Sequence, residues 1–137
     1  MFRRTIRIET QGEGEIVDLT PHVARSVHES GVVDGLVNVF VPGSTAAVTT
    51  IEYEAGVLAD LKRALSVIAP DTASYAHDRA WGDGNGRSHV KAAVVGPSVT
   101  VPVIDGDLGC GTWQQIVLLE LDVRPSRNRS IIVTVTG

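Results

Sequence analysis

Residues 35–51 read Gly-Leu-Val-Asn-Val-Phe-Val-Pro-Gly-Ser-Thr-Ala-Ala-Val-Thr-Thr-Ile, and this stretch decides the fold class. Residues 35–41 are apolar at nearly every position, which is typical of a central strand that is buried on both faces. Proline and glycine at positions 42 and 43 end that strand, and residues 46–51 form a second run of small and β-branched residues. The stretch therefore predicts two strands joined by a tight turn.

The segments on the N-terminal side continue the β-rich pattern. Residues 2–9 alternate between two faces as a half-buried strand does, and residues 16–19 form a further extended segment. Thr20 provides a helix N-cap and Pro21 a first helical residue, and Gly31 ends the short helix that they begin. We therefore predict two strands and one helix before the central strand.

The C-terminal side adds one clear helix and several strands. Residues 53–68 carry leucine and valine at helical spacing, and a proline follows this predicted helix. Residues 75–88 lose all regular spacing and predict a polar loop, after which hydrophobic spacing returns at residues 89–95. Further strands are expected at residues 98–104, 112–122 and 129–136. Two main helices among these strands predict an α+β domain with mixed or antiparallel sheet layers, rather than a doubly wound sheet.

The composition is that of one ordinary globular domain, and it argues against several classes of protein. Of the 137 residues 43% are hydrophobic and 20% charged, so residues 1–137 fit a single domain. A net charge of −4 and only 4% aromatic residues disfavour nucleic-acid binding. One cysteine, no signal peptide and no apolar run of membrane-spanning length lead us to expect a cytoplasmic protein without a membrane partner.

The histidines stand out among the residues that could carry chemistry. We interpret His22 as exposed and His28 as a cation that suits the end of the first predicted helix. His77 and His89 instead share a polar stretch with aspartates, an asparagine and arginines. Two imidazoles near carboxylates can bind a metal or exchange protons near neutral pH, although this spacing matches no dedicated zinc motif. The alternative is a solvated loop with incidental histidines.

The turn at residues 43–47 combines small residues with two hydroxyls. Its backbone N–H groups and the hydroxyls of Ser44 and Thr45 could bind a phosphate, and the alternative is a plain strand connection. Neither a P-loop nor a dinucleotide-binding glycine motif is present. The sequence therefore predicts no nucleotide cofactor.

One face of the predicted strand at residues 112–122 carries an acid among apolar neighbours, because Glu120 shares strand parity with Ile116 and Leu118. A buried glutamate needs a partner, so Glu120 is a candidate partner for a histidine, an arginine or a metal. The alternative is that the strand emerges into water at this position. Cys110 has no activating base and is interpreted as inert.

A series of short motifs runs through residues 35–137. They are Val39-Phe40-Val41-Pro42, Ser44-Thr45-Ala46-Ala47-Val48-Thr49, Glu52, Asp60, Tyr75-x-His77-Asp78, Asn85-x-x-x-His89, Gly96-Pro97-Ser98, Val101-Pro102-Val103, Gly106-x-Leu108, Gly111-Thr112-Trp113-Gln114, Leu119-x-x-Asp122 and Arg127-x-Arg129. Taken in order, they resemble the YjbQ-like family, whose members are also called secondary thiamine-phosphate synthases. The N-terminal strand and helix agree with that family in pattern rather than in motif.

The resemblance implies a small α+β subunit that assembles as a homotrimer, with a polar pocket lined by shared His, Glu, Asn and Gln residues. It also implies weak thiamine-phosphate synthase activity, which joins hydroxymethylpyrimidine diphosphate to a thiazole phosphate and releases pyrophosphate. Two departures from the family pattern bear on the site. Gly43 stands where the family usually has a histidine, and Ile51 stands where it usually has an asparagine.

We therefore expect a transferase that acts on small phosphorylated substrates, in which arginines bind phosphate and a metal neutralises a diphosphate leaving group. The residues assigned to catalysis are His77, His89 and Glu52. Those assigned to phosphate and substrate binding are Ser44, Thr45, Asn85, Arg87, Ser98, Gln114 and Arg127. Those assigned to a divalent metal ion, zinc or magnesium, are His77, His89 and Glu120. The rival hypotheses are a non-catalytic trimer that binds a small ligand or metal, and a purely structural oligomer.

Overall fold

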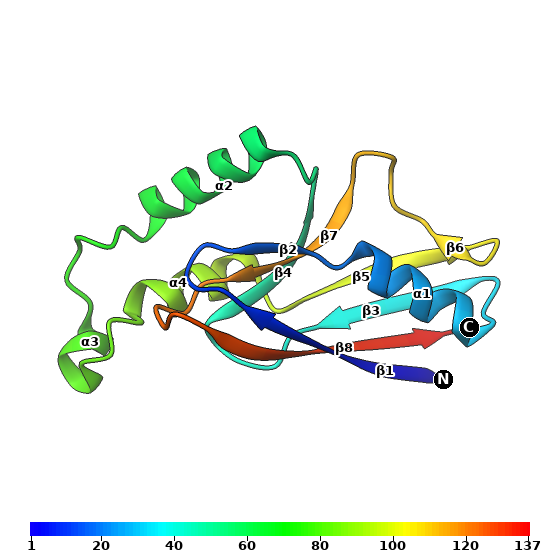
Figure 1. Ribbon diagram of the computed structural model, residues 1–137, viewed down its shortest axis with the longest axis horizontal. Helices are drawn as coiled ribbons and strands as arrows, with labels where there is room; N and C mark the ends of the chain where they lie inside the picture. Colours follow the sequence, from blue (N-terminus) through cyan, green and yellow to red (C-terminus); the bar gives the residue numbers. More distant parts are fainter.

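The computed structural model describes residues 1–137 and contains eight strands and four helices (Figure 1). The strands are β1 (Phe2–Thr10), β2 (Ile16–Asp18), β3 (Gly35–Phe40), β4 (Ala46–Ile51), β5 (Ser98–Ile104), β6 (Asp107–Leu108), β7 (Gln115–Glu120) and β8 (Arg127–Thr136). The helices are α1 (Thr20–Ser30), α2 (Ala55–Ile68), α3 (Ala76–Trp81) and α4 (Gly86–Val95). Strands and helices do not alternate regularly, and the predicted α+β class is confirmed.

The strands form two sheets in which every neighbouring pair is antiparallel. The larger sheet has the order β1-β8-β3-β5-β6, and the smaller has the order β2-β7-β4. The turn after β3 therefore does not close a hairpin, because β3 and β4 belong to different sheets. The chain crosses from one sheet to the other at residues 41–45, and the polar residues of the site gather near this crossing.

Two hydrophobic clusters hold three layers together. The first lies between the two sheets and includes Val37, Val39, Ile116, Leu118, Ile131 and Val133. The second lies on the other face of the small sheet, under α2 and α4, and includes Ala47, Leu65, Ala92, Val117 and Leu119. Successive residues of β7 thus face opposite clusters, as the two-residue period of a strand requires. The small sheet is buried on both faces because it is the middle layer.

The prediction of a polar loop over residues 75–88 is wrong, and two main helices are too few. This stretch contains α3 and the start of α4 (Figure 1). No residue of α3 is buried, so it carries no apolar stripe from which its helical period could be recognised. Gly82 ends α3 in the left-handed conformation with φ 67°, a backbone geometry that favours glycine.

The other predicted elements are found with small shifts of their ends. The helix predicted at residues 53–68 begins at Ala55, because the Glu54 side chain accepts hydrogen bonds from the N–H groups of Gly56 and Val57. Strand β7 begins at Gln115 rather than at residue 112. His22 is exposed, and His28 lies in the last turn of α1, where its Nε2 is 2.8 Å from Asp107 Oδ1.

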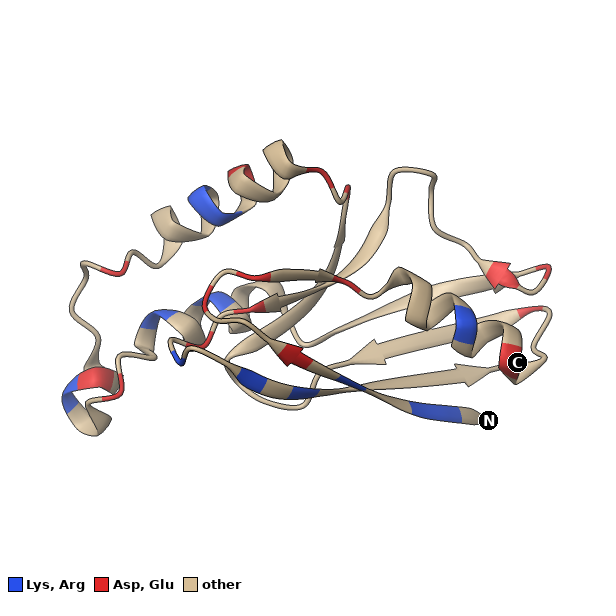
Figure 2. Ribbon diagram, in the orientation of Figure 1, with Lys and Arg blue, Asp and Glu red and all other residues tan.

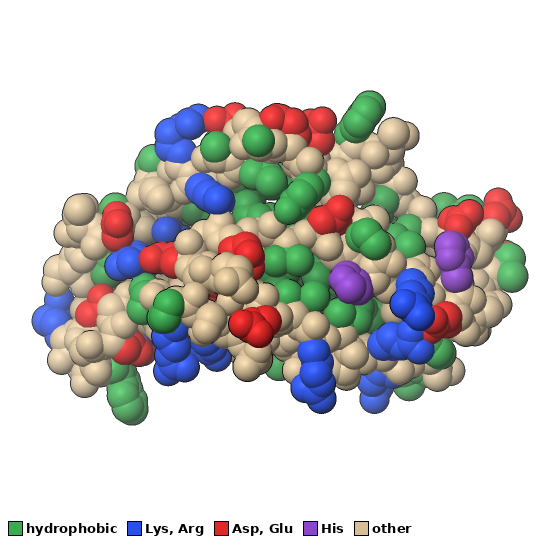
Figure 3. All heavy atoms as spheres, viewed as in Figure 1, with side chains coloured by type: hydrophobic (Ala, Val, Ile, Leu, Met, Phe, Trp, Pro, Cys, Tyr) green, Lys and Arg blue, Asp and Glu red, His purple; other side chains and the backbone are tan.

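The surface of the molecule is mixed in character. No helix has both the length and the apolar composition needed to cross a membrane. Figure 2 shows basic residues on α2, on α4 and at the start of β8. In the space-filling view, apolar side chains are visible over α2 and in the seam between α2 and the strands beneath it (Figure 3). Val67 and Ile68, at the C-terminal end of α2, are 79% and 54% exposed.

Candidate functional site

A buried ion pair joins the ends of the two sheets. Glu120, the last residue of β7, is completely buried, and Arg129, near the start of β8, is 3% exposed. The guanidinium binds the carboxylate through two bonds, from Nε to Oε1 at 2.8 Å and from Nη2 to Oε2 at 2.6 Å. This two-point geometry is the strongest form of arginine–carboxylate pairing.

Two further hydrogen bonds bind the carboxylate of this ion pair. Thr10 donates to Glu120 Oε1 at 2.7 Å, and the backbone N–H of Asp122 donates to Oε2 at 3.1 Å. Burial alone would raise the pKa of Glu120, but the hydrogen bonds from Arg129 and Thr10 outweigh it and lower that pKa below its usual value. The carboxylate is therefore held in its charged form.

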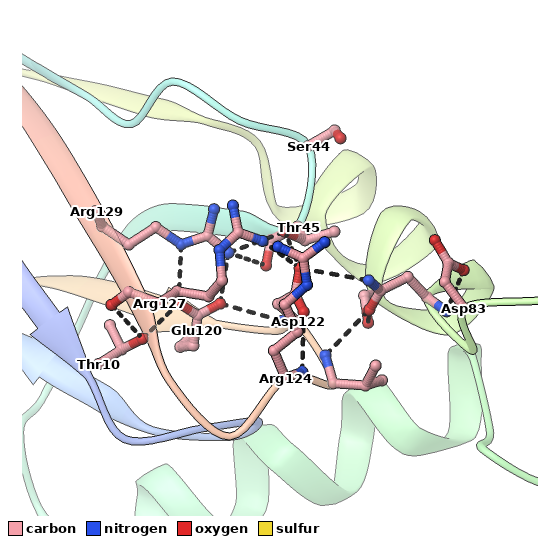
Figure 4. Close-up of polar contacts among 12 residues, drawn as sticks. Thr10, Ser44, Thr45, Asp83, Glu120, Asp122, Arg124, Arg127 and Arg129 are labelled. Atoms are coloured by element: carbon pink, nitrogen blue, oxygen red, sulfur yellow. Dashed lines mark hydrogen bonds and ion pairs between the residues drawn. The ribbon is translucent and has the colours of Figure 1, made fainter.

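A second buried carboxylate, Asp122, organises the neighbouring residues (Figure 4). Its Oδ2 accepts hydrogen bonds from Thr45 Oγ1 at 2.9 Å and from Asn85 Nδ2 at 3.3 Å, and Arg127 binds the same oxygen. Burial opposes ionisation of Asp122, but its pKa is lowered by the Arg124 N–H, Thr45 and Arg127 around it. We call the seven residues Thr10, Thr45, Asn85, Glu120, Asp122, Arg127 and Arg129 the buried polar network.

One nitrogen of the Arg129 guanidinium, Nη1, has no hydrogen-bond partner within the chain. Arg129 Nη2 also donates to Thr45 Oγ1 at 2.9 Å, so Nε and Nη2 are both used, whereas none of its hydrogen bonds involves Nη1. A Cβ atom placed on Gly43 would lie 3.1 Å from this Nη1, and Gly43 itself has φ 123°. In Figure 4 the unbonded end of the guanidinium points away from Glu120, towards the side on which Ser44 lies. The absence of a side chain at Gly43 leaves this donor open.

The two histidines of the polar stretch meet beside this network. Their ring centroids are 4.5 Å apart at an interplanar angle of 65°, with His77 on α3 and His89 on α4. His89 Nδ1 lies 3.1 Å from the carbonyl oxygen of Ser44. Because a carbonyl only accepts, Nδ1 carries the proton, and the Nε2 atom of a neutral His89 is left with a free lone pair.

An aspartate orients the other imidazole. His77 Nε2 lies 3.1 Å from Asp83 Oδ1 and 3.3 Å from Asp83 Oδ2. The N–H of Asn85 is the main cause that lowers the pKa of Asp83, and His77 lowers it further. One ligand atom each from His77, Asp78 and Asp83 lies within 4.8 Å of the others, which is a donor set of one nitrogen and two oxygens. Such a mixed set fits zinc better than magnesium, which prefers oxygen ligands alone.

The structure brings some of the predicted site residues together. Thr45, Asn85 and Arg127 belong to the buried polar network, and His77, His89 and Ser44 contact one another beside it. Glu120, predicted to bind a metal, lies in the same region but pairs with Arg129 rather than with either histidine. It is buried, so the alternative that the strand emerges into water at this position is wrong.

Other predicted residues lie elsewhere on the chain. Ser98 accepts a hydrogen bond from Asn38 on the outer face of the large sheet, and Arg87 is occupied by a two-point bond to Glu13, both distances being 2.8 Å. Glu52 lies just beyond the far end of β4, and strand rise of about 3.3 Å per residue places it roughly 23 Å from Thr45.

Gln114 lies at this far end too, where its Nε2 donates to Thr50 Oγ1 at 3.2 Å. Within a single chain, therefore, the two ends of the β4–β7 strand pair each carry part of the predicted site. Glu52 and Gln114 occupy one end, and the histidines and the buried polar network occupy the other.

Three residues of the buried polar network were not assigned by sequence reasoning, namely Thr10, Asp122 and Arg129. A signal for Arg129 was present, because it shares strand parity with Ile131, Val133 and Val135, all of which face the core. An arginine on a core-facing row needs a buried acid opposite it, and Glu120 offers one. Asp122 lies two residues after Glu120 and therefore shares its strand parity, but β7 ends at Glu120.

Fold and site together define a small α+β protein with a buried arginine–carboxylate network and a histidine pair at the junction of two antiparallel sheets. Comparison with known proteins identifies the family to which it belongs. The family model described as "UPF0047 protein YjbQ-like" matches residues 4–137, and the chain belongs to this YjbQ-like family.

Relatives and solved structures agree with that placement. A UPF0047 protein of Methanothermobacter thermautotrophicus is 38% identical over 137 residues, covering 100% of this chain and 93% of the relative. One of Mycobacterium tuberculosis is 46% identical over 110 residues, covering 78% of each chain. A crystal structure described as a YbjQ-like protein of unknown function from Sulfolobus solfataricus has a TM-score of 0.89 at 33% identity, covering 98% of this chain and 97% of that one. The YjbQ/UPF0047 protein of Clostridium acetobutylicum has a TM-score of 0.83 at 31% identity, covering 99% and 100%.

Proposed function

We propose that the chain is a transferase that binds a small phosphorylated substrate between Ser44, Arg129 and His89. The observation that carries this proposal is the open Nη1 of Arg129, a donor on a guanidinium that is 3% exposed and held by Glu120. Ser44 is exposed, and its hydroxyl makes no hydrogen bond within the chain. A fixed guanidinium edge, a free hydroxyl and an imidazole suit the oxygens of a phosphate.

The reaction that the family resemblance implies is consistent with these groups. In thiamine-phosphate synthesis the thiazole nitrogen forms a bond to the methylene carbon of hydroxymethylpyrimidine diphosphate. The carbon–oxygen bond breaks, and its electron pair leaves with pyrophosphate. This exchange transfers no proton, so the task for the protein is to orient two substrates and neutralise the leaving group. We assign that neutralisation to Arg127, Arg129 and a protonated His89.

A divalent cation would add positive charge at the leaving pyrophosphate when bound. The residues that would hold it are His77, Asp78 and Asp83, whose ligand atoms lie close together. Asp83 already orients His77, and Asp78 Oδ1 accepts the N–H of Gly86 at 2.9 Å, so both carboxylates are fixed by α4 and its N-terminal turn. Zinc is the ion that this mixed donor set favours over magnesium.

Pyrophosphate release tests the transferase proposal. The purified chain, supplied with hydroxymethylpyrimidine diphosphate and thiazole phosphate, is expected to release pyrophosphate, and His89→Ala is expected to abolish the release. His22→Ala is the matched control, because His22 is exposed on α1, away from the network. Unchanged turnover in His89→Ala would contradict the assignment of His89.

We also propose that the chain assembles as a homotrimer in the cytoplasm. Leu36 and Phe40 of β3 and Ile104 of β5 are 51%, 37% and 53% exposed on the outer face of the large sheet, which no helix covers. A trimer also offers a way to complete the site, because the Glu52 end of one subunit can lie beside the histidines of the next. Light scattering is expected to give three times the subunit mass of 14.5 kDa, and a monomer mass would contradict the proposal.

A second candidate function is binding of a metal or small ligand without turnover, and the cluster of His77, Asp78 and Asp83 favours it. Metal analysis of the purified chain, followed by calorimetry with thiazole phosphate, separates the two. Binding of zinc and of thiazole phosphate without any pyrophosphate release would select this candidate. Release that depends on His89 would exclude it.

A further inference from the structure

A separate pocket lies on the other side of α4, between this helix, α2 and the turn that joins β1 to β2. It has a volume of about 220 Å³, and the charged residues that line it are Glu13, Lys62, Asp71, Arg87 and Lys91. None of these residues belongs to the buried polar network or to the histidine pair. Figure 2 shows the basic positions of α2 and α4 that contribute to it.

Lys91 is the unusual member of this group. It is only 9% exposed, yet its ammonium group forms no ion pair within 4.0 Å and no hydrogen bond. A lysine is rarely buried without a partner, because its ammonium group then loses hydration without gaining an ion pair or a hydrogen bond. Lys91 lines the pocket, and its nitrogen is not fully enclosed, because no fully buried side-chain nitrogen of the chain lacks a partner. A partner can therefore reach it from the pocket.

The chain's own acids do not supply that partner. Both carboxylate oxygens of Glu13 are bound by Arg87, through Nε and Nη2 at 2.8 Å each. Asp71 lines the pocket but pairs with no cation within 4.0 Å. Three basic residues thus face two acidic ones, whereas the whole chain has a net charge of −4. The pocket is a locally positive place on an acidic protein, and it suits an anion.

The floor of the pocket is apolar. Leu65 and Leu121 line it, and both also line an adjoining narrow crevice of about 20 Å³ beneath α2, together with Ile16, Leu61 and Leu119. An occupant can therefore place a charged group beside Lys91 and a short apolar group against these side chains.

We propose that this pocket binds a small amphipathic anion, with a phosphate or carboxylate head at Lys91 and a short alkyl or ring group against Leu65. The site is independent of the proposed transferase site. Lys91 and His89 are two residues apart on α4 and face different sides of the helix, so the two sites share a helix but no lining residue.

Calorimetry with butyl phosphate, butyrate and inorganic phosphate tests the proposal and identifies the head group. Butyl phosphate or butyrate is expected to bind at least about tenfold more tightly than inorganic phosphate, since a buried four-carbon group adds more than about 1.4 kcal/mol, equivalent to tenfold. Lys91→Met keeps the packing of the side-chain stem and is expected to weaken that binding at least tenfold. Asp71→Asn removes a competing negative charge and is expected to tighten it.

Two controls locate the bound ligand. Arg63→Met removes an exposed cation of α2 and is expected to bind like the wild type, because Arg63 pairs with Asp60 and does not line the pocket. Ser44→Ala removes a hydroxyl of the proposed transferase site without changing a contact of the fold, and it is expected to retain the binding that Lys91→Met loses. Pyrophosphate release, if present, is expected to persist in Lys91→Met. Equal affinity of the wild type and Lys91→Met, or binding that disappears in Ser44→Ala instead, would overturn the proposal.

Discussion

Arg129→Met is expected to destabilise the fold more than any other single substitution in the site. It leaves Glu120, which is fully buried, without the cation that binds both of its oxygens. Removing one partner of a buried ion pair costs about 3–5 kcal/mol. Glu120 keeps its hydrogen bonds from Thr10 and from the Asp122 N–H, so we expect the loss of unfolding free energy to be about 3 kcal/mol. For a domain of this size, about 3 kcal/mol lowers the melting temperature by roughly 10 °C.

The pH dependence of the loss gives this prediction a signature. Without Arg129, burial raises the pKa of Glu120 in the folded state above that in the unfolded state. The folded state then binds the proton more tightly, so the variant regains stability as the pH falls towards about 5. Thermal and urea unfolding followed by circular dichroism, at one protein concentration and at two pH values, measures both effects.

A double variant supplies the control for this argument. Glu120→Gln with Arg129→Met removes both charges from the same place, and it is expected to recover more than half of the loss of the single variant. A single variant that loses less than about 1 kcal/mol would refute the reasoning, because the pair would then not act as a buried pair. A double variant that is no more stable than the single variant would also refute the reasoning.

Three further predictions follow from the same geometry. The pKa values of both buried carboxylates are lowered on folding from usual values of 4.5 and 3.8, so the unfolded chain binds more protons in acid. Stability is therefore expected to be full above about pH 5 and to fall as the pH drops through the folded-state pKa values, measured by urea midpoints. Gly43→Ala is expected to cost about 1–3 kcal/mol, more than Gly96→Ala, because both glycines have positive φ but only Gly43 faces a guanidinium at 3.1 Å. Mixing inactive Glu52→Ala and His89→Ala subunits is expected to restore part of the pyrophosphate release if each site uses two subunits, and a mixture as inactive as its parts would contradict that arrangement.

The strands were predictable from the sequence, but the helices of the polar stretch were not. Alternation of buried and exposed residues in β1 and β8 is a direct consequence of strand geometry, so the sequence carries it plainly. α3 buries no residue, and its ends are set by local backbone geometry at Tyr75 and Gly82. A hydrophobic period cannot reveal a helix that has no apolar face.

The site was predictable as a set of residue types but not as a set of contacts. The polar stretch that they share identified His77 and His89, and their rings do meet. The sequence predicted a strand at residues 46–51, which already separates Thr45 from Glu52, but it did not show that the assigned site residues divide between the two ends of that strand. It also did not pair Glu120 with Arg129, since that contact depends on how the two sheets are stacked, which no local pattern records.

The network explains which substitutions can separate binding from folding. Thr45 and Asn85 each bond to Asp122, and Arg129 holds Glu120, so removing any of them disturbs the fold together with the site. Ser44 differs, because its hydroxyl makes no hydrogen bond within the chain and only its backbone carbonyl accepts from His89. Ser44→Ala therefore keeps every contact that supports the fold. A loss of substrate affinity in this variant with unchanged unfolding can only report a contact that the substrate itself makes.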